Sequence, residues 1–171
     1  SPNAKDDIIL VMDNAVGSLA KTTTLDLNDI ELAFIAGFLE GDGCISAKIS
    51  PTSGSYRVLI TISFTQRIEG RVVLEYLEKL LGENIADYAS HNMSELMIRD
   101  RKKVKDFLSK ISPFLISKKG QAEIALKIIE ILDRSRRGEL RIPTNLLEAV
   151  RLAEEILSLN SGRRNKTIHT F

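Results

Sequence analysis

The sequence predicts an α+β fold in which a four-stranded antiparallel sheet is backed by helices. An apolar, glycine-containing segment at 29–41 has the composition of a packed helix. Strict alternation of polar and apolar residues then follows over 44–50 and 57–65, which is typical of a half-buried hairpin. Amphipathic helical periodicity returns beyond residue 100. A hairpin with one apolar face needs helices to cover that face, so the two patterns predict one packed domain.

The start of the chain is polar and weakly patterned. Residues 8–16 have the pattern of a short helix, and 17–24 have that of a linker. We therefore expect an arm of unknown role over 1–27 and a single domain over 28–171. Asn28 and Glu31 have the spacing of a capping box, so the apolar helix should begin near Asp29 and end near Gly41.

The alternating hairpin should present two different faces. Its apolar set is expected to face the helices and its polar set to form an exterior surface. The apolar set comprises Ile45, Ala47, Ile49, Val58, Ile60, Ile62 and Phe64. The turn-rich segment 51–55 joins the two strands.

The second half of the chain predicts helices around a weaker strand pair. An amphipathic helix over 71–81 ends at Gly82. Strands are expected at 85–90 and 95–99. Further helices are expected at 101–111, 118–133 and 144–160, with breaks at Pro113 and Pro143.

The apolar helix ends in an unusual way. Ala33, Gly37 and Gly41 recur at i, i+4 and i+8, so one stripe has almost no side chain and lets another helix approach closely. Asp42 follows at the carboxyl end, where the helix dipole disfavours an acid by a few tenths to ~1 kcal/mol. A core helix with a glycine cap would not explain this acid, which indicates metal binding beside a tight helix contact.

Composition narrows the class of protein. No stretch approaches the ~20 apolar residues of a membrane span, and no signal peptide is visible. Cys44 is the single cysteine, so no internal disulfide can form. We expect an intracellular, reducing compartment, with chloroplast and mitochondrion among the options. His91 and His169 lack the spacing of zinc ligands.

The net charge of +1 conceals an uneven distribution. Residues 1–42 hold eight acids and two bases, whereas 43–171 hold 22 bases and 15 acids. Bases cluster at 99–105, 118–119, 134–137 and 163–166. Clustered bases are typical of phosphate contact, although for any single cluster a solvated helix end is the better interpretation.

Four segments, taken in order, resemble the motifs of LAGLIDADG homing endonucleases, which are nucleases of mobile introns. They are Ile-Ala-Gly-Phe-Leu-Glu-Gly-Asp-Gly at 35–43, Phe-Thr-Gln-Arg at 64–67, Pro-Phe-Leu-Ile-Ser-Lys-Lys-Gly-Gln-Ala at 113–122 and Leu-Asn-Ser-Gly-Arg-Arg-Asn-Lys-Thr at 159–167. The resemblance covers roughly 28–168. The signature occurs once, as in the single-motif subfamily, whose two protomers pair through this helix.

The resemblance implies a set of roles for the site. Asp42, Gln66 and Lys118 are the expected catalytic residues: Gln66 would orient the attacking water and Lys118 would lie near the scissile phosphate. Mg²⁺ would bind the Asp42 carboxylate and the Gly41 carbonyl. The expected dimer contacts are Ala33, Ala36, Gly37, Glu40 and Gly41. Gly70 departs from the family, where Arg or Lys is usual, and Arg71 or Arg67 is expected to compensate.

The resemblance also implies that the polar sheet face reads double-stranded DNA. The expected contacts from the first hairpin are Ser46, Lys48, Ser50, Arg57, Leu59, Thr61, Ser63 and Thr65. From the second strand pair they are Asp87, Glu95 and Met97, with the register near Asp87 ambiguous. Arg67, Arg71, Arg99, Arg136, Arg163, Lys166 and Thr167 complete the set, mostly as phosphate contacts.

These features together predict a homodimeric, magnesium-dependent endonuclease that cuts a long, near-palindromic duplex. Two alternatives use the same scaffold: an RNA-splicing maturase and a non-cleaving DNA-binding regulator. Asp42 and Gln66 favour cleavage, because a pure binder needs no such acid. A helix-mediated interaction protein without nucleic acid would leave the polar sheet face unexplained.

Overall fold

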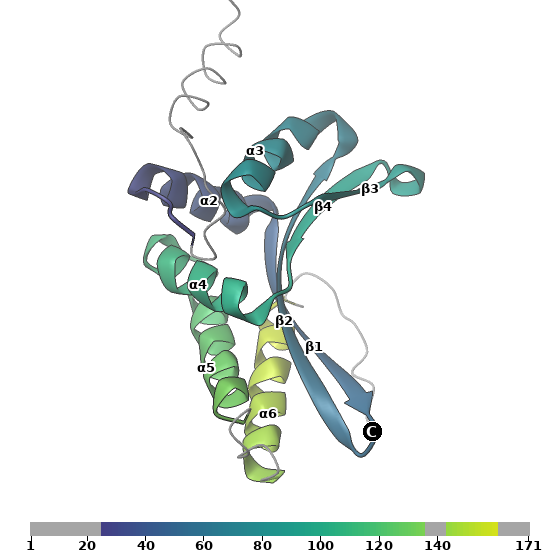
Figure 1. Ribbon diagram of the computed structural model, residues 1–171, viewed down its shortest axis with the longest axis vertical. Coiled ribbons are helices and arrows are strands. Elements are labelled where there is room, and N and C mark those ends of the chain that lie inside the picture. The colour runs from purple at the N-terminus through teal and green to yellow at the C-terminus, as the bar shows by residue number, and fades with distance from the viewer. Residues whose placement is uncertain (1–24, 136–142, 161–171) are drawn as a thin grey trace, which may run out of the picture.

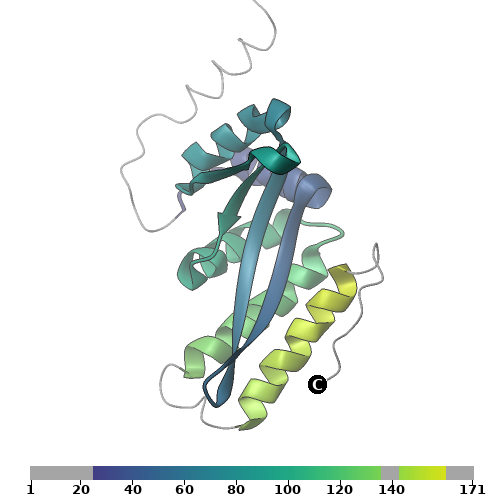
Figure 2. The ribbon, with the colours of Figure 1, turned by 90° about the vertical axis from the view of Figure 1, so that its right-hand side faces the viewer.

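A computed structural model describes residues 25–135 and 143–160 and has the predicted α+β architecture. The strands are β1 (Gly43–Thr52), β2 (Ser55–Arg67), β3 (Ile85–Tyr88) and β4 (Met93–Ile98), and they form one antiparallel sheet in the order β1-β2-β4-β3. The helices are α2 (Asp29–Asp42), α3 (Arg71–Leu81), α4 (Arg101–Ile111), α5 (Lys119–Ser135) and α6 (Pro143–Asn160). In the described chain every helix lies on one side of the sheet (Figures 1 and 2).

The start of α2 is fixed by the predicted capping box. The Asn28 side chain accepts from the Glu31 amide at 2.9 Å, and the Glu31 carboxylate accepts from the Asn28 amide at 2.9 Å. The packed unit begins upstream of the expected boundary at residue 28, because Leu25 and Leu27 pack against the core and the Leu25 amide donates to Asp106. The short helix expected at 8–16 lies outside the described residues.

The first hairpin has the predicted inside and outside. Ile62 and Phe64 are fully buried, and Val58 and Ile60 are nearly so. Ser46 pairs with Thr61 across the strands, and their hydroxyl oxygens lie 2.7 Å apart. The polar residues of both strands therefore share the face that the helices leave uncovered.

In the second strand pair, β3 ends earlier than expected, at Tyr88, and β4 begins earlier than expected, at Met93. The turn between them is a 3₁₀ turn at Ala89–His91, followed by Asn92 in the left-handed region with φ 52°. β4 pairs with β2 over 62–67, so β2 from 55 to 61 has β1 as its strand neighbour in the described sheet. The hairpin of β1 and β2 thus extends beyond the four-stranded part of the sheet (Figure 1).

Aromatic packing joins α2 and α4 to the sheet. The Phe64 ring stacks on Phe38 with centroids 5.8 Å apart and meets the edge of Phe107 at 6.2 Å. The Asn160 side-chain amide donates to the Ile45 carbonyl at 2.7 Å, which ties the end of α6 to the edge strand β1. Among the described residues, no helix combines the length and apolar character needed to cross a bilayer.

Candidate functional site

The carboxyl end of α2 and the end of β2 bring two predicted catalytic residues together. Gln66 follows the buried side of β2, two residues beyond Phe64, so its side chain is directed toward the helices. Its Nε2 donates to Asp42 Oδ2 at 2.7 Å. Because a carboxylate can only accept, the amide NH₂ group must face Asp42.

Lys118 lies at the same helix end. Its ammonium donates to the carbonyls of Leu39 and Glu40, each at 2.7 Å. A cation at the last carbonyls of a helix offsets the negative end of the dipole, which reduces the cost of placing Asp42 there. An ammonium has three N–H groups, so one is left for a further acceptor.

Glu40 holds the segment that carries Lys118. Its carboxylate accepts from the amides of Ile116 at 2.7 Å, Ser117 at 3.2 Å and Lys118 at 3.2 Å, and also from the Ser117 hydroxyl. Burial acts to raise the pKa of the Glu40 carboxyl, but the Ser117 hydroxyl, the Ile116 and Lys118 amides and the Lys118 charge together lower it. The Glu40 carboxylate is therefore engaged within its own protomer, and its expected contact with a partner stays a prediction.

The small-residue stripe of α2 is exposed. Ala33, Gly37 and Gly41 all lie on the surface, and a Cβ added at either glycine would meet no atom within 4 Å. Ile30, which sequence reasoning missed, extends the stripe and is 83% exposed. Ala36 is 1% exposed and belongs to the protomer's own core, so its place among the expected dimer contacts is corrected.

The oxygen donors at this helix end suit a hard divalent cation. They are the carboxylate of Asp42 and the carbonyl of Gly41, both on the exposed last turn of α2. In the described ranges no three His, Cys, Asp or Glu side chains cluster as metal ligands. Mg²⁺ fits such a sparse donor set, because it keeps several waters and shares substrate phosphates.

The pairing register places most of the predicted DNA contacts on one face. Cross-strand partners on that face are Ser46 with Thr61, Lys48 with Leu59, Ser50 with Arg57, Ser63 with Met97, and Thr65 with Glu95. Arg67 continues the face at the end of β2, opposite Met93. This face is the helix-free side of the sheet, which fits a surface that docks against a duplex.

Several residues of this face were missed from the sequence, among them Cys44, Tyr88 and Met93. Cys44 pairs with Ser63, and Tyr88 pairs with Met93 and donates to Glu95 at 3.3 Å. Extending the alternation one step back from Ser46 and from Glu95 would have found Cys44 and Met93. Burial raises the pKa of the Cys44 thiol, against the opposing charge of Lys118.

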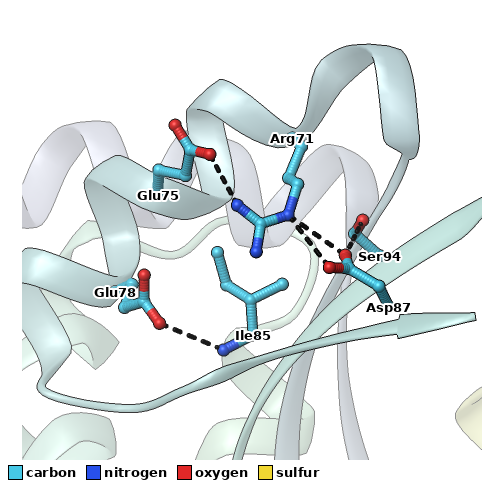
Figure 3. A network of polar contacts seen from close by, with 6 residues as sticks. All are labelled: Arg71, Glu75, Glu78, Ile85, Asp87 and Ser94. Carbon is cyan, nitrogen blue, oxygen red and sulfur yellow. Dashed lines mark hydrogen bonds and ion pairs between the residues drawn. The ribbon is translucent and has the colours of Figure 1, made fainter.

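The expectation for Asp87 was wrong, because it lies on the helix-facing side of the sheet. It pairs with Ser94, whose side chain is fully buried. The Ser94 hydroxyl donates to Asp87 at 2.6 Å, and Arg71 Nε donates at 3.1 Å, as Figure 3 shows. These two donors lower the pKa of Asp87, Ser94 most.

The Arg71 guanidinium is bound by two acids, Asp87 and Glu75. Its Nη1 also pairs with Glu75 at 2.5 Å (Figure 3). Of the other predicted phosphate contacts, Arg99 is exposed beyond β4 and its Nε donates to Met97 Sδ at 2.9 Å. Arg136, Arg163, Lys166 and Thr167 lie outside the described residues.

Comparison with known proteins finds one family and several relatives. A family model described as LAGLIDADG endonuclease matches residues 35–130. The chain is 31% identical over 141 residues to DNA endonuclease I-CreI of Chlamydomonas reinhardtii, which covers 80% of this chain and 82% of that protein. It is 28% identical over 140 residues to DNA endonuclease I-CvuI of Chlorella vulgaris, which covers 80% and 84%.

The fold is similar to that of a solved DNA complex. Homing endonuclease I-CvuI bound to the I-CreI target, with 2 mM Mg and uncleaved DNA, has a TM-score of 0.70 and 27% identity. That match covers 81% of this chain and 87% of the solved one.

Proposed function

This chain belongs to the LAGLIDADG endonuclease family and is a site-specific DNA endonuclease, and on that premise we propose that two copies pair through α2 and cut a long, near-palindromic duplex with Mg²⁺. The 2.7 Å contact between Gln66 and Asp42, beside Lys118, is the observation that carries this proposal. It places an acid, an amide and a cation at the exposed end of the helix that bears the small-residue stripe. RNA splicing and non-cleaving regulation are not favoured, because both curated relatives are DNA endonucleases.

Hydrolysis of a phosphodiester needs a positioned water, stabilised charge on phosphorus and a leaving 3′ oxygen. The Gln66 carboxamide donates to Asp42 through its NH₂ group, which leaves its carbonyl oxygen to accept from a water. The third N–H of Lys118 is suited to a phosphate oxygen as charge develops there. Mg²⁺ held by Asp42 and the Gly41 carbonyl would supply Lewis acidity and a lowered pKa of bound water.

A homodimer fits both the stripe and the acid. The exposed stripe of Ala33, Gly37 and Gly41 allows close approach of a second α2, and that approach brings the two Asp42 carboxylates near each other. Two adjacent carboxylates repel unless a cation lies between them, so metal binding and pairing support each other. Two identical sheet faces would read two half-sites, which accounts for a near-palindromic target.

We also propose how the chain is divided. Residues 28–171 would form the endonuclease domain, and 1–27 an arm without an assigned role. The contacts of Leu25 and Leu27 with the core bring the end of that arm into the packed unit.

A cleavage-site selection tests the function. Wild-type protein and Asp42→Asn would each be mixed with a randomised duplex library and Mg²⁺, and cut ends would be sequenced. One near-symmetric site, cut by the wild type and not by Asp42→Asn, is the expected result. Enrichment of bound DNA without cutting would overturn the nuclease assignment and direct the next test to RNA.

A further inference from the structure

Gly70 lies directly beside the Gln66 side chain. A Cβ at position 70 would lie 2.9 Å from Gln66 Oε1, 3.7 Å from its Cδ and 3.8 Å from its Cβ. The backbone of Gly70 has φ −95° and ψ 9°, a conformation open to other residues, so the turn itself does not require glycine. What the glycine provides is space for the carboxamide.

The surrounding contacts hold both sides of this space in place. The 3₁₀ turn Ile68–Gly70 is anchored to the β3–β4 turn, because the Ile68 backbone amide donates to the Asn92 carbonyl at 3.2 Å and the Asn92 side-chain Nδ2 donates to the Glu69 carboxylate at 2.8 Å. Arg71 is held away by Asp87 and Glu75. With the turn anchored, a new side chain at 70 would displace Gln66 rather than the backbone.

We propose that Gly70 is a positioning residue for the nuclease reaction. By lacking a Cβ, it leaves the volume in which Gln66 lies with its NH₂ group on Asp42 and its carbonyl oxygen facing position 70. Compared with the basic residue expected at position 70, glycine lacks the positive charge but allows the Gln66 carboxamide to keep one orientation. This inference rests on the proposed function of Gln66 and Asp42.

Gly70→Ala tests the proposal with a change of one methyl group. We expect single-turnover cleavage to slow by about tenfold to a hundredfold, because small displacements of a positioning group have effects of this size. Affinity for uncleaved duplex in Ca²⁺ should not change. Gly120→Ala is the matched control, since Gly120 is exposed on α5 and an added Cβ there meets no atom within 4 Å.

Combining Gly70→Ala with Gln66→Ala separates positioning from general damage. If Gly70 acts through Gln66, adding Gly70→Ala to Gln66→Ala should cause no further reduction in rate. The proposal would be overturned if Gly70→Ala cleaved at the wild-type rate. It would also be overturned if Gly70→Ala reduced the rate equally with Gln66 present and with Gln66→Ala.

A readout independent of cleavage keeps this inference distinct from the proposed function. The NMR signals of the Gln66 side-chain NH₂ group can be assigned by their disappearance in Gln66→Ala. They should shift in Gly70→Ala and not in Gly120→Ala, and unchanged signals would overturn the positioning role. A wild-type protein that fails to cut any duplex would instead overturn the nuclease assignment.

Discussion

At the scale of the residue, Asp42 depends on groups that come from distant parts of the chain. It lies where the dipole of α2 is unfavourable, and Lys118 and Gln66 compensate from α5's leading segment and from β2. Glu40 in turn fixes Lys118 through the amides of the 116–118 segment. The polar groups of the site therefore hold one another in place through hydrogen bonds, and the removal of one is expected to make the others more mobile.

Glu40→Gln should lower stability at neutral pH. The folded-state pKa of Glu40 is lowered, so its contribution is present above the unfolded-state pKa and is lost as pH falls through the folded-state value. We expect a destabilisation of about 1 kcal/mol near pH 7, given the partial exposure of the carboxylate, and a smaller difference from wild type at about pH 3. Urea midpoints at both pH values measure this.

Glu123→Gln provides the comparison for that experiment. Glu123 is exposed on α5, and the same change there should leave the midpoint unaltered at both pH values. If both substitutions changed the urea midpoint equally, the stabilising role assigned to Glu40 would be wrong.

At the scale of the element, α2 has one face built for its own protomer and one that is exposed. Gly37→Leu should weaken pairing, because overpacking costs about 1–3 kcal/mol and so raises the dimer dissociation constant about 10- to 100-fold. The protomer should still fold, since position 37 is open within it. Sedimentation across a concentration series measures the change.

Glu155→Leu adds the same side chain to an exposed position of α6, away from α2. It should leave the dissociation constant unchanged. A dimer that tolerates Gly37→Leu equally well would show that another surface joins the protomers.

Two arginines, Arg67 at the end of β2 and Arg71 at the start of α3, are expected to contribute differently to DNA affinity. Arg67→Ala should reduce the slope of log affinity against log salt by about 1 for each phosphate that the Arg67 side chain neutralises. Arg71→Ala should leave this slope unaltered, because Arg71 is paired with Asp87 and Glu75. Filter binding over a salt series distinguishes the two variants. If both substitutions lowered the slope equally, Arg71 would also be a phosphate contact.

The elements show where sequence reasoning succeeds and where it stops. The bounds of α2 and α3 follow from local signals: the Asn28 capping box and the Gly82 cap in the left-handed region. Asp87 was misplaced because β3 is too short for alternation to fix a face and its turn shifts the register. The bonds between Glu40 and Lys118 join residues 78 positions apart, a separation over which local patterns say nothing.

At the scale of the whole molecule, each sheet residue of a homodimer should act twice. Leu59→Gln on the polar face should change base preference at two positions related by the symmetry of the target. A well-placed amide discriminates between bases by about 1–3 kcal/mol, so a shift of roughly 10- to 100-fold is expected at each. Repeating the site selection with this variant measures it, and a change at one position only would contradict the symmetric arrangement.

The length of the first hairpin has a consequence for fidelity. β1 begins directly after Asp42 and runs away from it toward the tip of the hairpin. Near that tip, residues 55–61 of β2 pair with β1 but not with β4. A two-stranded ribbon twists more than the interior of a wider sheet, and its exposed tip lacks the core packing that holds Val58 and Ile60, so the tip should yield more readily. The inner bases of each half-site would thus contact the more rigid, wider part of the sheet, and the outer bases would contact the more flexible hairpin tip. Tolerance to mutation in the target should rise from its centre to its ends, which gives a mobile nuclease gene room to follow a drifting host sequence.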